Sequence, residues 1–373
     1  MARLARSMLP ATSNINATMD HTPPLVRHLR DRRPGALSHG PLRRFATGLR
    51  HAVTALLAAA LGLAQAQGCP DSAMDLHEPL PGVLVRHGQW PAVTPESHDH
   101  HASTVVLWSG RRASVFDPGP TAHEGQALQR ALACRGVHQI ERVFNSHAHA
   151  EQVLANVAYR APVAATARTQ ASMRQRCPDC LAALRHDLGQ AATRGTRIAL
   201  PKQVLREGQI LQAGGRHWQV LDLRSAHTES DLALWSHADG VLIAGGLIDG
   251  QRLVLAQGSV VGWLAALDRL QALQPQWLIG QHRIAHGSAQ VQAAFTAQRE
   301  ALCQLARLSW QGLEQGWSET EALNRMAVQG TPDAQRQQRF NLLRAWREME
   351  ALWLVQAPPP AVCQTVSTPD IGR

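Results

Sequence analysis

The stretch from Asn145 to Gln152 (NSHAHAEQ) places two histidines two residues apart and a glutamate two residues further on. It directly follows the apolar run Ile140 to Phe144 (IERVF), so we expect His147 and His149 to leave a strand end and point into one cleft. Neutral imidazoles in such a cleft suit zinc or iron. The chain has 19 histidines, however, and any single one is more simply a solvated or hydrogen-bonded surface residue.

The wider segment Val143 to Tyr159 (VFNSHAHAEQVLANVAY) resembles the metallo-β-lactamase fold superfamily. Within it, the segment most resembles the quinoprotein relay system zinc metallohydrolases, which typically read VINTHxHPDHVxGN there. Four later segments are similar to motifs of that family in order and spacing: Ala226 to Leu232 (AHTESDL, for AHTxxDL), Val241 to Leu247 (VLIAGGL, for a strand ending in AGDL), Gly258 to Leu273 (GSVVGWLAALDRLQAL, for GSxxGWLAALDRL) and Trp277 to His282 (WLIGQH, for VVPGHG). The resemblance covers roughly Pro81 to Ala327 and implies an α/β fold, the αββα sandwich of two facing sheets with helices outside, here with a C-terminal helical extension.

The resemblance also implies a set of metal ligands. One metal is held by the two histidines of HxH and the histidine of the HT motif, and all three are present as His147, His149 and His227. Three imidazoles leave an open fourth position, as in catalytic zinc sites. We therefore expect zinc as the cofactor, about one ion per chain.

The second metal site of the family is altered in this chain. Its four ligand positions are occupied by Glu151, Gln152, Gly246 and His282. The amide oxygen of Gln152 is a poor zinc ligand and Gly246 has no side chain, so a second tightly held zinc is not expected. His282 is taken as a further metal ligand. His286, in Ala285 to Gly287 (AHG), resembles the family's GHG better locally, but it lies four residues later than the strand end places it.

Glu151 keeps a carboxylate in the altered half of the motif. It suits three roles: a metal ligand, a general base, or a hydrogen-bond acceptor that orients a neighbouring histidine. A surface glutamate is the simpler alternative, but its place in the motif favours a role in the site. We take Glu151 as the catalytic residue.

The predicted function is that of an exported metal-dependent hydrolase. Zinc lowers the pKa of its bound water towards about 7, and the resulting hydroxide attacks an ester, thioester or related bond of a small molecule. The alternative is a non-catalytic homologue that binds a metal or small ligand in the periplasm, which the altered Gln152 and Gly246 favour. The resemblance links either function to a quinoprotein or redox pathway partner, and it names no substrate.

The basic charge of the chain is concentrated in a leader. Nine arginines against two aspartates give the first 66 residues a net charge of +7, out of +9 for the chain. The remainder is close to neutral and contains one lysine, Lys202, so nucleic-acid binding is not expected. The apolar run from Ala52 to Ala64 and the small residues Ala64 and Ala66 are typical of a secretory signal cleaved before Gln67, and the run is too short for a permanent membrane anchor. We expect a periplasmic or secreted protein.

The six cysteines all follow this cleavage site. An even count in an exported chain predicts disulfides, although the sequence does not choose among 15 pairings. The pair in Cys177 to Cys180 (CPDC) suits either a redox or metal motif or a small structural loop. The loop is favoured, because no second CxxC and no thioredoxin-like strand accompanies it.

Hydrophobic periodicity gives the elements that position these residues. Strands are expected in short β-rich runs: 82–86, 103–108, 113–116, 209–211, 219–223, 232–236 and 240–244. Helices are expected at 123–134, 153–159, 169–188, 291–316, 318–327 and 333–355. The domains follow as a leader (1–66), a metallo-β-lactamase-like domain (67–287), a helical extension (288–356) and a flexible tail (357–373).

Three other features are expected to serve structure. The cluster His98 to His101 (HDHH) is interpreted as a solvated or cleft-lining loop. Asp117 resembles the family's buried aspartate that supports the loop carrying the histidines, and Asp231 is expected to brace the loop of His227. Trp346, Trp353 and three leucines of the last helix (Leu342, Leu343 and Leu354) are expected to form the core of the helical extension.

Overall fold

The structure is a computed structural model, and it describes residues 74–88, 102–249, 253–255, 257–325 and 332–364. The predicted leader (1–66), Cys69 and the His98 to His101 cluster lie outside the described residues. The chain divides into two compact units, Met1–Gly68 and Cys69–Arg373. All described residues belong to the second unit.

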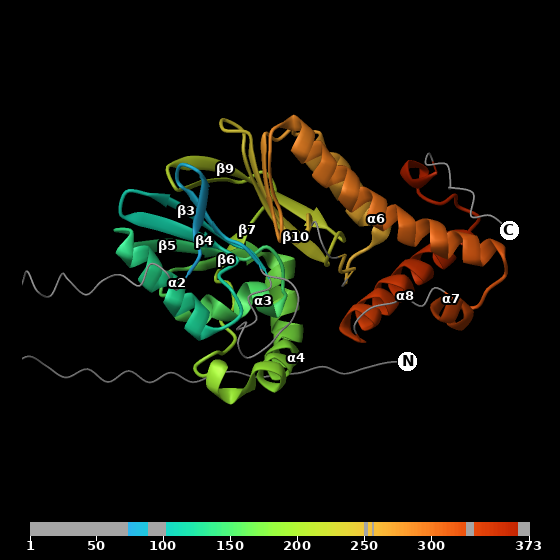
Figure 1. The fold of residues 1–373 in the computed structure, drawn as a ribbon, viewed down its shortest axis with the longest axis horizontal. Helices are drawn as coiled ribbons and strands as arrows, with labels where there is room; N and C mark the ends of the chain where they lie inside the picture. The colour runs from blue at the N-terminus through green and yellow to red at the C-terminus, as the bar shows by residue number, and fades with distance from the viewer. Residues whose placement is uncertain (1–73, 89–101, 250–252, 256, 326–331, 365–373) are drawn as a thin grey trace, which may run out of the picture. The chain divides into compact units, whose positions relative to one another are not determined.

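Two β-sheets form the centre of this unit (Figure 1). The first sheet has seven strands in chain order: β1 (His77–Leu80), β2 (Val83–Arg86), β3 (Thr104–Ser109), β4 (Arg112–Phe116), β5 (Gln139–Phe144), β6 (Val163–Thr166) and β7 (Gln203–Leu205). The second has six strands in the order β13, β12, β11, β10, β9, β8: β13 (Ile284–His286), β12 (Trp277–Gly280), β11 (Val241–Gly245), β10 (Ser230–Ser236), β9 (Arg216–Arg224) and β8 (Ile210–Ala213). Strands β4 to β7 pair in parallel, as do β11 and β12.

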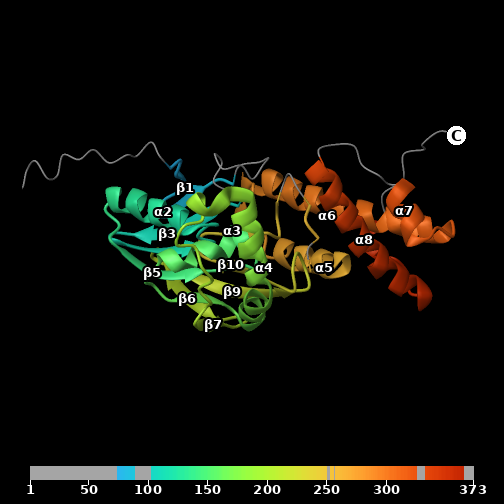
Figure 2. The ribbon, with the colours of Figure 1, turned by 90° about the horizontal axis from the view of Figure 1, so that it is seen from below.

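Helices and short 3-10 turns connect and cover the sheets (Figure 2). They are α2 (Ala122–Cys134), α3 (Ala150–Val153), η2 (Leu154–Ala158), α4 (Ala167–Ala192), α5 (Val260–Gln271), α6 (Ser288–Glu314), α7 (Glu319–Arg325), α8 (Pro332–Leu354) and η3 (Ala361–Cys363). Thr121 caps α2 by accepting a hydrogen bond from the backbone N–H of Glu124, and Ser259 caps α5 in the same way. Ser318 and Glu321 form a reciprocal capping pair at the start of α7.

The sandwich has four backbone layers: helices, the first sheet, the second sheet and helices. Apolar side chains fill the three spaces between these layers. Leu107 and Phe144 of the first sheet pack against Leu234 and other residues of the second. On the outer face of the first sheet, α2 packs against strand residues such as Val115. On the outer face of the second sheet, α5 and α6 pack against Leu242 and its neighbours. Successive strand residues therefore point alternately to the facing sheet and to the helices, and the predicted αββα sandwich is confirmed.

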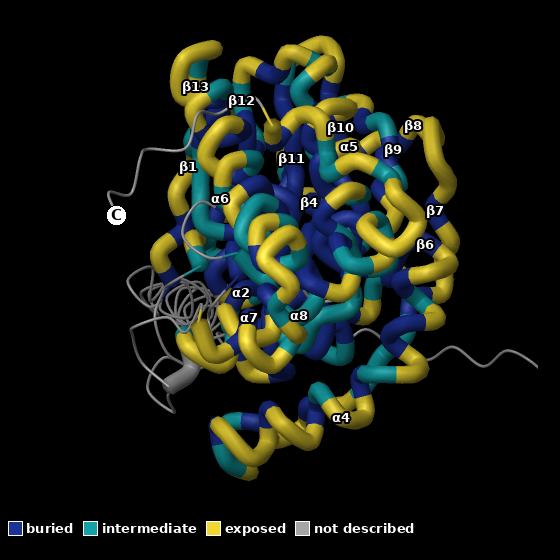
Figure 3. Tube along the Cα trace, turned by 90° about the vertical axis from the view of Figure 1, so that its right-hand side faces the viewer, coloured by how far each residue is buried: buried dark blue, intermediate teal, exposed yellow. Residues whose placement is uncertain are grey.

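Strand β11 lies in the middle of this arrangement and is buried along its whole length (Figure 3). A strand covered on both faces reads as a continuous apolar run, here VLIAG, because both sets of alternating side chains are buried.

The C-terminal helices share a core with the sandwich. Ala345 and Met349 of α8 join the same apolar cluster as Trp263 of α5 and Leu302 of α6. Cys303 of α6 forms a disulfide with Cys363. The first residues of the expected flexible tail are thus tied to α6 by a covalent bond.

Two expectations for the last helix are wrong. Trp346 and Leu342 are buried as predicted, but the side chains of Trp353 and Leu354 are 40% and 75% exposed. They lie on the final turn of α8, at the margin of the apolar cluster that covers the second sheet, where the ring centroid of Trp353 is 5.3 Å from that of Trp310. No helix among the described residues is long and apolar enough to cross a bilayer.

The structural loop expected at Cys177 to Cys180 is also wrong. Both cysteines lie inside α4 (Ala167–Ala192), which stays helical through Pro178 and is kinked further on, at Gly189. Packing explains the difference: one face of α4 carries Met173, Cys177 and three leucines into an apolar cluster, and this burial outweighs the local cost of a proline.

Candidate metal centre

The candidate site lies at one end of the sandwich, where strands of both sheets finish. His147 and His149 follow β5 of the first sheet, and His227 lies between β9 and β10 of the second. Gly246 and His282 follow the parallel strands β11 and β12. Because parallel strands end at the same edge of a sheet, residues far apart in the sequence meet here.

Three histidines form the centre of the site. One ring nitrogen each from His147, His149 and His227 lies within 4.8 Å of the others, and this is the one group of metal-competent side chains among the described residues. The Nε2 atom of His147 lies 3.1 Å from Nδ1 of His149 and 3.2 Å from Nε2 of His227. The three rings are nearly perpendicular to one another, with centroids 4.6 to 4.9 Å apart.

These distances fit a tetrahedral metal ion. Zinc–nitrogen bonds of about 2.0–2.1 Å at tetrahedral angles place neighbouring ligand nitrogens about 3.3 Å apart. The 3.1 Å and 3.2 Å separations are close to that value. Two imidazole nitrogens at this distance with both lone pairs facing inward repel each other unless a proton or a cation lies between them. The donor set therefore fits a metal such as zinc.

Hydrogen bonds fix the ring of His147. Its Nδ1 lies 2.7 Å from the hydroxyl of Ser146, which in turn donates to Asp117 Oδ2 at 2.6 Å. Since the hydroxyl proton is used on Asp117, Ser146 accepts from Nδ1–H, and the lone pair of Nε2 is left for a metal. Asp117 Oδ1 also accepts from the backbone N–H of Ser146 at 2.8 Å.

Asp117 is thus the support of the histidine loop, as expected. It lies in the left-handed region at φ 54°, just after β4, and this turn directs its carboxyl under Ser146. Burial raises the pKa of Asp117 to about 8, although both hydrogen bonds from Ser146 act in the opposite direction.

His227 is fixed in a corresponding way. Its Nδ1 lies 2.6 Å from the carbonyl oxygen of Val254, so it donates there and Nε2 faces the other two rings. Its loop is braced by Asp231, whose two carboxylate oxygens accept from the backbone N–H and the hydroxyl of Thr228, both at 2.9 Å. The expected role of Asp231 is confirmed.

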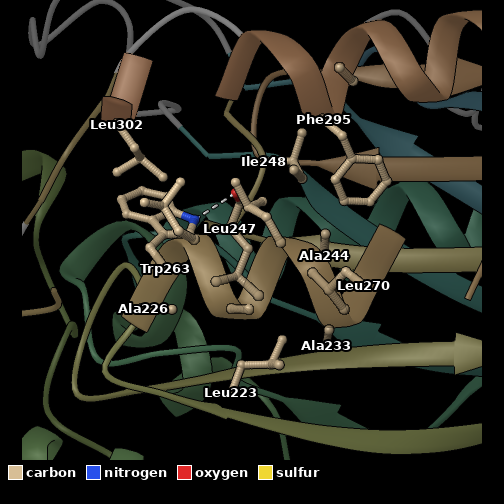
Figure 4. Close-up of a cluster of buried hydrophobic side chains, with 14 of the residues drawn as sticks. Leu223, Ala226, Ala233, Ala244, Leu247, Ile248, Trp263, Leu270, Phe295 and Leu302 are labelled. Carbon is tan, nitrogen blue, oxygen red and sulfur yellow. Dashed lines mark hydrogen bonds between the residues drawn. The ribbon is translucent and has the colours of Figure 1, made fainter. Parts of the chain in front are cut away.

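Trp263 of α5 packs behind His227, with the ring centroids 5.2 Å apart. Its indole N–H donates to the carbonyl of Leu247 at 3.0 Å (Figure 4). One fully buried side chain therefore holds the ring of His227 and the chain that follows Gly246.

Burial keeps two of the ligands neutral. It lowers the pKa of His147 well below 6.5, and the neighbouring histidines add to the effect. It lowers the pKa of His227 to about 3, against the opposing hydrogen bond to Val254. Neutral imidazole is the form that binds metal, so the fold prepares these two ligands before any metal arrives.

Gly246 packs directly against the ligand rings. A Cβ atom there would lie 2.8 Å from Cδ2 of His227 and 2.9 Å from Cε1 of His147. Real Cβ atoms are essentially never that close to another atom, so any other residue would have to displace the rings. The glycine backbone thus approaches the rings of His147 and His227 more closely than a residue with a side chain could.

Gln152 is almost fully buried, at 1% exposed. Its amide Nε2 donates to Gln281 Oε1 at 3.4 Å, and its own Oε1 has no hydrogen-bond partner. Gln281 is tied to the first sheet because its carbonyl accepts from Ser103 N at 3.0 Å and from Ser103 Oγ at 2.5 Å. Gln152 and Gln281 thus form a buried amide pair.

His282 lies outside the three-histidine cluster. Its Nδ1 is 2.9 Å from Asp249 Oδ1, and both side chains are almost fully buried, at 4% and 6% exposed. Its Nε2 is buried without a hydrogen-bond partner, as suits a group that meets a ligand. Metal binding by His282 stays a prediction.

The rival residue His286 is exposed and stacks on Trp277, with ring centroids 3.8 Å apart. His286 belongs to β13, the edge strand of the second sheet next to β12, and Trp277 covers one face of its ring. The structure thus favours His282 over His286 as the residue near the site.

Glu151 lies in the first turn of α3, with its side chain 25% exposed. Its Oε1 is 3.8 Å from Nδ1 of His149. A carboxylate at this distance, open to solvent on one side, is placed to exchange protons with a molecule held at the histidines.

Sequence reasoning missed four contributors to the site. Ser146 and Trp263 orient ligand rings, and Asp249 orients His282. Ser146 could have been found from its place between a buried strand and the HxH motif. Asp249 could have been found as an acidic residue that closely follows the end of β11. Val254, which acts through its backbone carbonyl, gives no sequence signal at all.

A separate open hollow of about 880 Å³ lies at the opposite end of the sandwich. It is lined by hairpin turns, including Gly82, Gly214 and Asp239, and by Trp108 and Trp235. None of the site residues lines it, because these turns precede the strands whose far ends carry the histidines.

Comparison with solved structures gives many matches, whereas no protein-family model and no curated protein matches the chain. A β-lactamase domain protein from Burkholderia ambifaria is 20% identical with a TM-score of 0.56, over 78% of this chain and 91% of that one. A metallo-β-lactamase family protein from Thermus thermophilus is 16% identical with a TM-score of 0.56, over 74% and 95%. A stereoselective inverting sec-alkylsulfatase from a Pseudomonas species is 14% identical with a TM-score of 0.58, over 78% of this chain and 53% of that one. The sandwich of two sheets between helices, with histidines at its strand ends, is the metallo-β-lactamase fold.

Proposed function

We propose that this protein is a metal-dependent hydrolase with one firmly held metal ion, zinc, at His147, His149 and His227. The observation that carries the proposal is the spacing of the three ring nitrogens, because 3.1 Å and 3.2 Å suit neighbouring ligands of one tetrahedral ion. Three imidazole ligands leave a fourth position open for chemistry. Zinc bound there supplies Lewis acidity and an activated water at neutral pH.

The residues around the histidines have separate roles in orienting the ligands and in proton transfer. Ser146 and the carbonyl of Val254 hold the ligand rings in the tautomer that presents Nε2. Glu151, 3.8 Å from His149, accepts the proton of the attacking water. His282, oriented by Asp249, is the second group available for proton transfer or for binding the substrate.

A single metal is favoured over two. Gln152 presents an amide to Gln281, and Gly246 leaves no room for a bridging carboxylate. The substrate class that suits one activated water and one carboxylate base is an ester, a thioester or a related small-molecule bond.

We also propose that the protein is exported and acts in the periplasm or outside the cell. The disulfide between Cys303 and Cys363 supports this, together with the disulfide-bonded state of Cys134, because such bonds persist in oxidising compartments. A link to a quinoprotein pathway rests on the sequence resemblance alone, and so does a small molecule as the binding partner.

The test compares wild type with Glu151→Gln on a panel of generic esters and thioesters, with metal content measured on the same samples. Glutamine keeps the size of the side chain but cannot take a proton. We expect the variant to retain one metal per chain and to lose activity by about 100- to 10,000-fold, the usual contribution of a general base. Equal activity in both proteins would remove Glu151 from the mechanism.

The second candidate is a non-catalytic protein that binds metal or a small ligand at the same site. The filled space at Gly246 favours it, because the position of a second metal is closed. Metal bound at one per chain with no turnover of any ester or thioester by wild type would support this candidate and contradict the hydrolase.

A further inference from the structure

Helix α4 carries two free cysteines, Cys177 and Cys180, beside the candidate metal centre. The other described cysteines, Cys134, Cys303 and Cys363, are all disulfide-bonded. This pair is therefore the thiol pair of the described chain, and the metal chemistry proposed above does not use it.

The spacing of the pair permits a disulfide. Residues three apart in an α-helix have Cα atoms about 5 Å apart, inside the range of about 4.4–6.8 Å that disulfides span. Their Cβ atoms lie about 5–6 Å apart, however, whereas a disulfide needs about 3.5–4.5 Å. Closing the bond thus requires a local shift of the helix, and a bond under such strain is readily reduced.

Pro178 lies between the two cysteines and makes that shift easier. Proline has no N–H, so the carbonyl of Arg174 receives no helical hydrogen bond at this turn. The helix is locally weakened at the point where the disulfide has to form.

The two thiols have different environments. Cys177 is fully buried in an apolar cluster with Met173 and Leu181, whereas Cys180 is half-buried at the edge of that cluster. The neighbouring Cys177 thiol lowers the pKa of Cys180, whereas the neighbouring Cys180 and burial both raise the pKa of Cys177. Cys180 is thus the more accessible and more nucleophilic sulfur.

The position of α4 couples it to both histidine loops. Cys180 packs in one cluster with Ala148 and Ala150, which flank His149. On the same helix, Ser172 donates to Glu229 Oε2 at 2.7 Å, two residues after His227. A change in the helix at Cys180 therefore lies next to the loop of His149, and the same helix contacts the loop of His227 about two turns earlier, at Ser172.

We propose that Cys177 and Cys180 form a reversible dithiol–disulfide couple that reacts with organic disulfides. The Cys180 thiolate attacks one sulfur of the disulfide RSSR, which forms a mixed disulfide and releases the first thiolate. The Cys177 thiol then loses its proton and attacks the Cys180 sulfur, which closes the intramolecular bond and releases the second thiolate. The protein loses two electrons and two protons, and RSSR becomes two RSH.

The experiment equilibrates the purified chain with mixtures of oxidised and reduced glutathione. Thiols are then alkylated under denaturing conditions and the intact mass is measured. We expect two alkylation sites to be lost together as the oxidised fraction rises, while the Cys303–Cys363 disulfide stays intact in every mixture. The buried Cys303–Cys363 bond joins residues 60 positions apart and is the internal reference. Peptide mapping reports this bond and the Cys177–Cys180 pair in the same sample.

Matched serine variants test the assigned roles. Cys177→Ser should accumulate a stable mixed disulfide with one glutathione, because no second thiol resolves it. Cys180→Ser should form that adduct about tenfold less, because Cys177 is buried. Two thiols that stay alkylatable in wild type at every glutathione ratio would overturn the proposal, as would equal adduct formation by both variants. None of these readouts depends on metal binding or hydrolysis, so this inference fails or stands separately from the proposed function.

Discussion

Gly246 packs so closely against His227 that a Cβ atom on the glycine would lie 2.8 Å from Cδ2 of the imidazole. The backbone that follows β11 thus forms one wall of the histidine cluster. The ring can occupy its place because residue 246 has no side chain. The glycine at residue 246 and the placement of the rings of His147 and His227 are thus linked features of one site.

The first prediction follows from that contact. Gly246→Ala should displace the rings of His227 and His147, and we expect metal affinity to fall by about 10- to 100-fold, the usual effect of disturbing the support of a ligand. Competition with a chromophoric chelator measures the affinity. An unchanged value would mean that the rings can retreat from the added methyl group without loss of geometry.

The second prediction concerns metal stoichiometry and uses two histidine substitutions. Wild type should bind about one zinc per chain, and His227→Ala should lose tight binding because two ligands remain. His286→Ala is the matched control, since that ring stacks on Trp277 away from the cluster. Elemental analysis of dialysed protein gives the content. Two zincs in wild type, or equal loss in both variants, would contradict the assignment.

The third prediction tests the support beneath His147. Asp117→Asn places an amide where a carboxylate accepts two hydrogen bonds from Ser146, at 2.6 Å and 2.8 Å. One donor is then left poorly paired in a buried position, so we expect a loss of about 1–3 kcal/mol in the free energy of unfolding. We also expect metal affinity to weaken by about tenfold or more.

Asp239→Asn is the control for this substitution. Asp239 also accepts from a serine, Ser236, at 2.9 Å, but it lies at the opposite end of the sandwich. Its replacement should leave metal affinity unchanged. A similar loss of affinity in both variants would mean that Asp117 acts through general stability and not through Ser146.

The fourth prediction is the pH dependence of the metal-free protein. The pKa of His227 is about 3 when folded and 6.5 in the unfolded chain, so between these values the unfolded state binds one more proton. Stability is therefore lost as the pH falls through this window, by about 1.4 kcal/mol per pH unit for this group. Chemical unfolding of chelated wild type and chelated His227→Gln at several pH values isolates the effect. Parallel curves for the two proteins between pH 6 and pH 4 would show that His227 is not held neutral.

Much of the fold was predictable because it depends on local patterns. The apolar run of β11 (VLIAG) and the periodicity of α2 each specify an element without reference to the rest of the chain. The short strand β6 (Val163–Thr166) was missed, because four small buried residues carry no alternation that separates a strand from a loop. The CPDC segment was predicted as a structural loop because no second CxxC and no thioredoxin-like strand accompanies it, but burial of Cys177 and Met173 in an apolar cluster keeps it helical.

His147, His149 and His227 could be recognised as candidate ligands from the sequence, because the segments around them resemble motifs of a known family. How those ligands are held became visible only in the folded chain. The hydrogen bond from His227 to the carbonyl of Val254 and the pairing of His282 with Asp249 join residues 27 and 33 positions apart. The closure of the space at Gly246 likewise depends on rings that come from two different sheets. Residue types are local information, whereas distances between strand ends are set by how the sheets pack, and that packing is a property of the whole core.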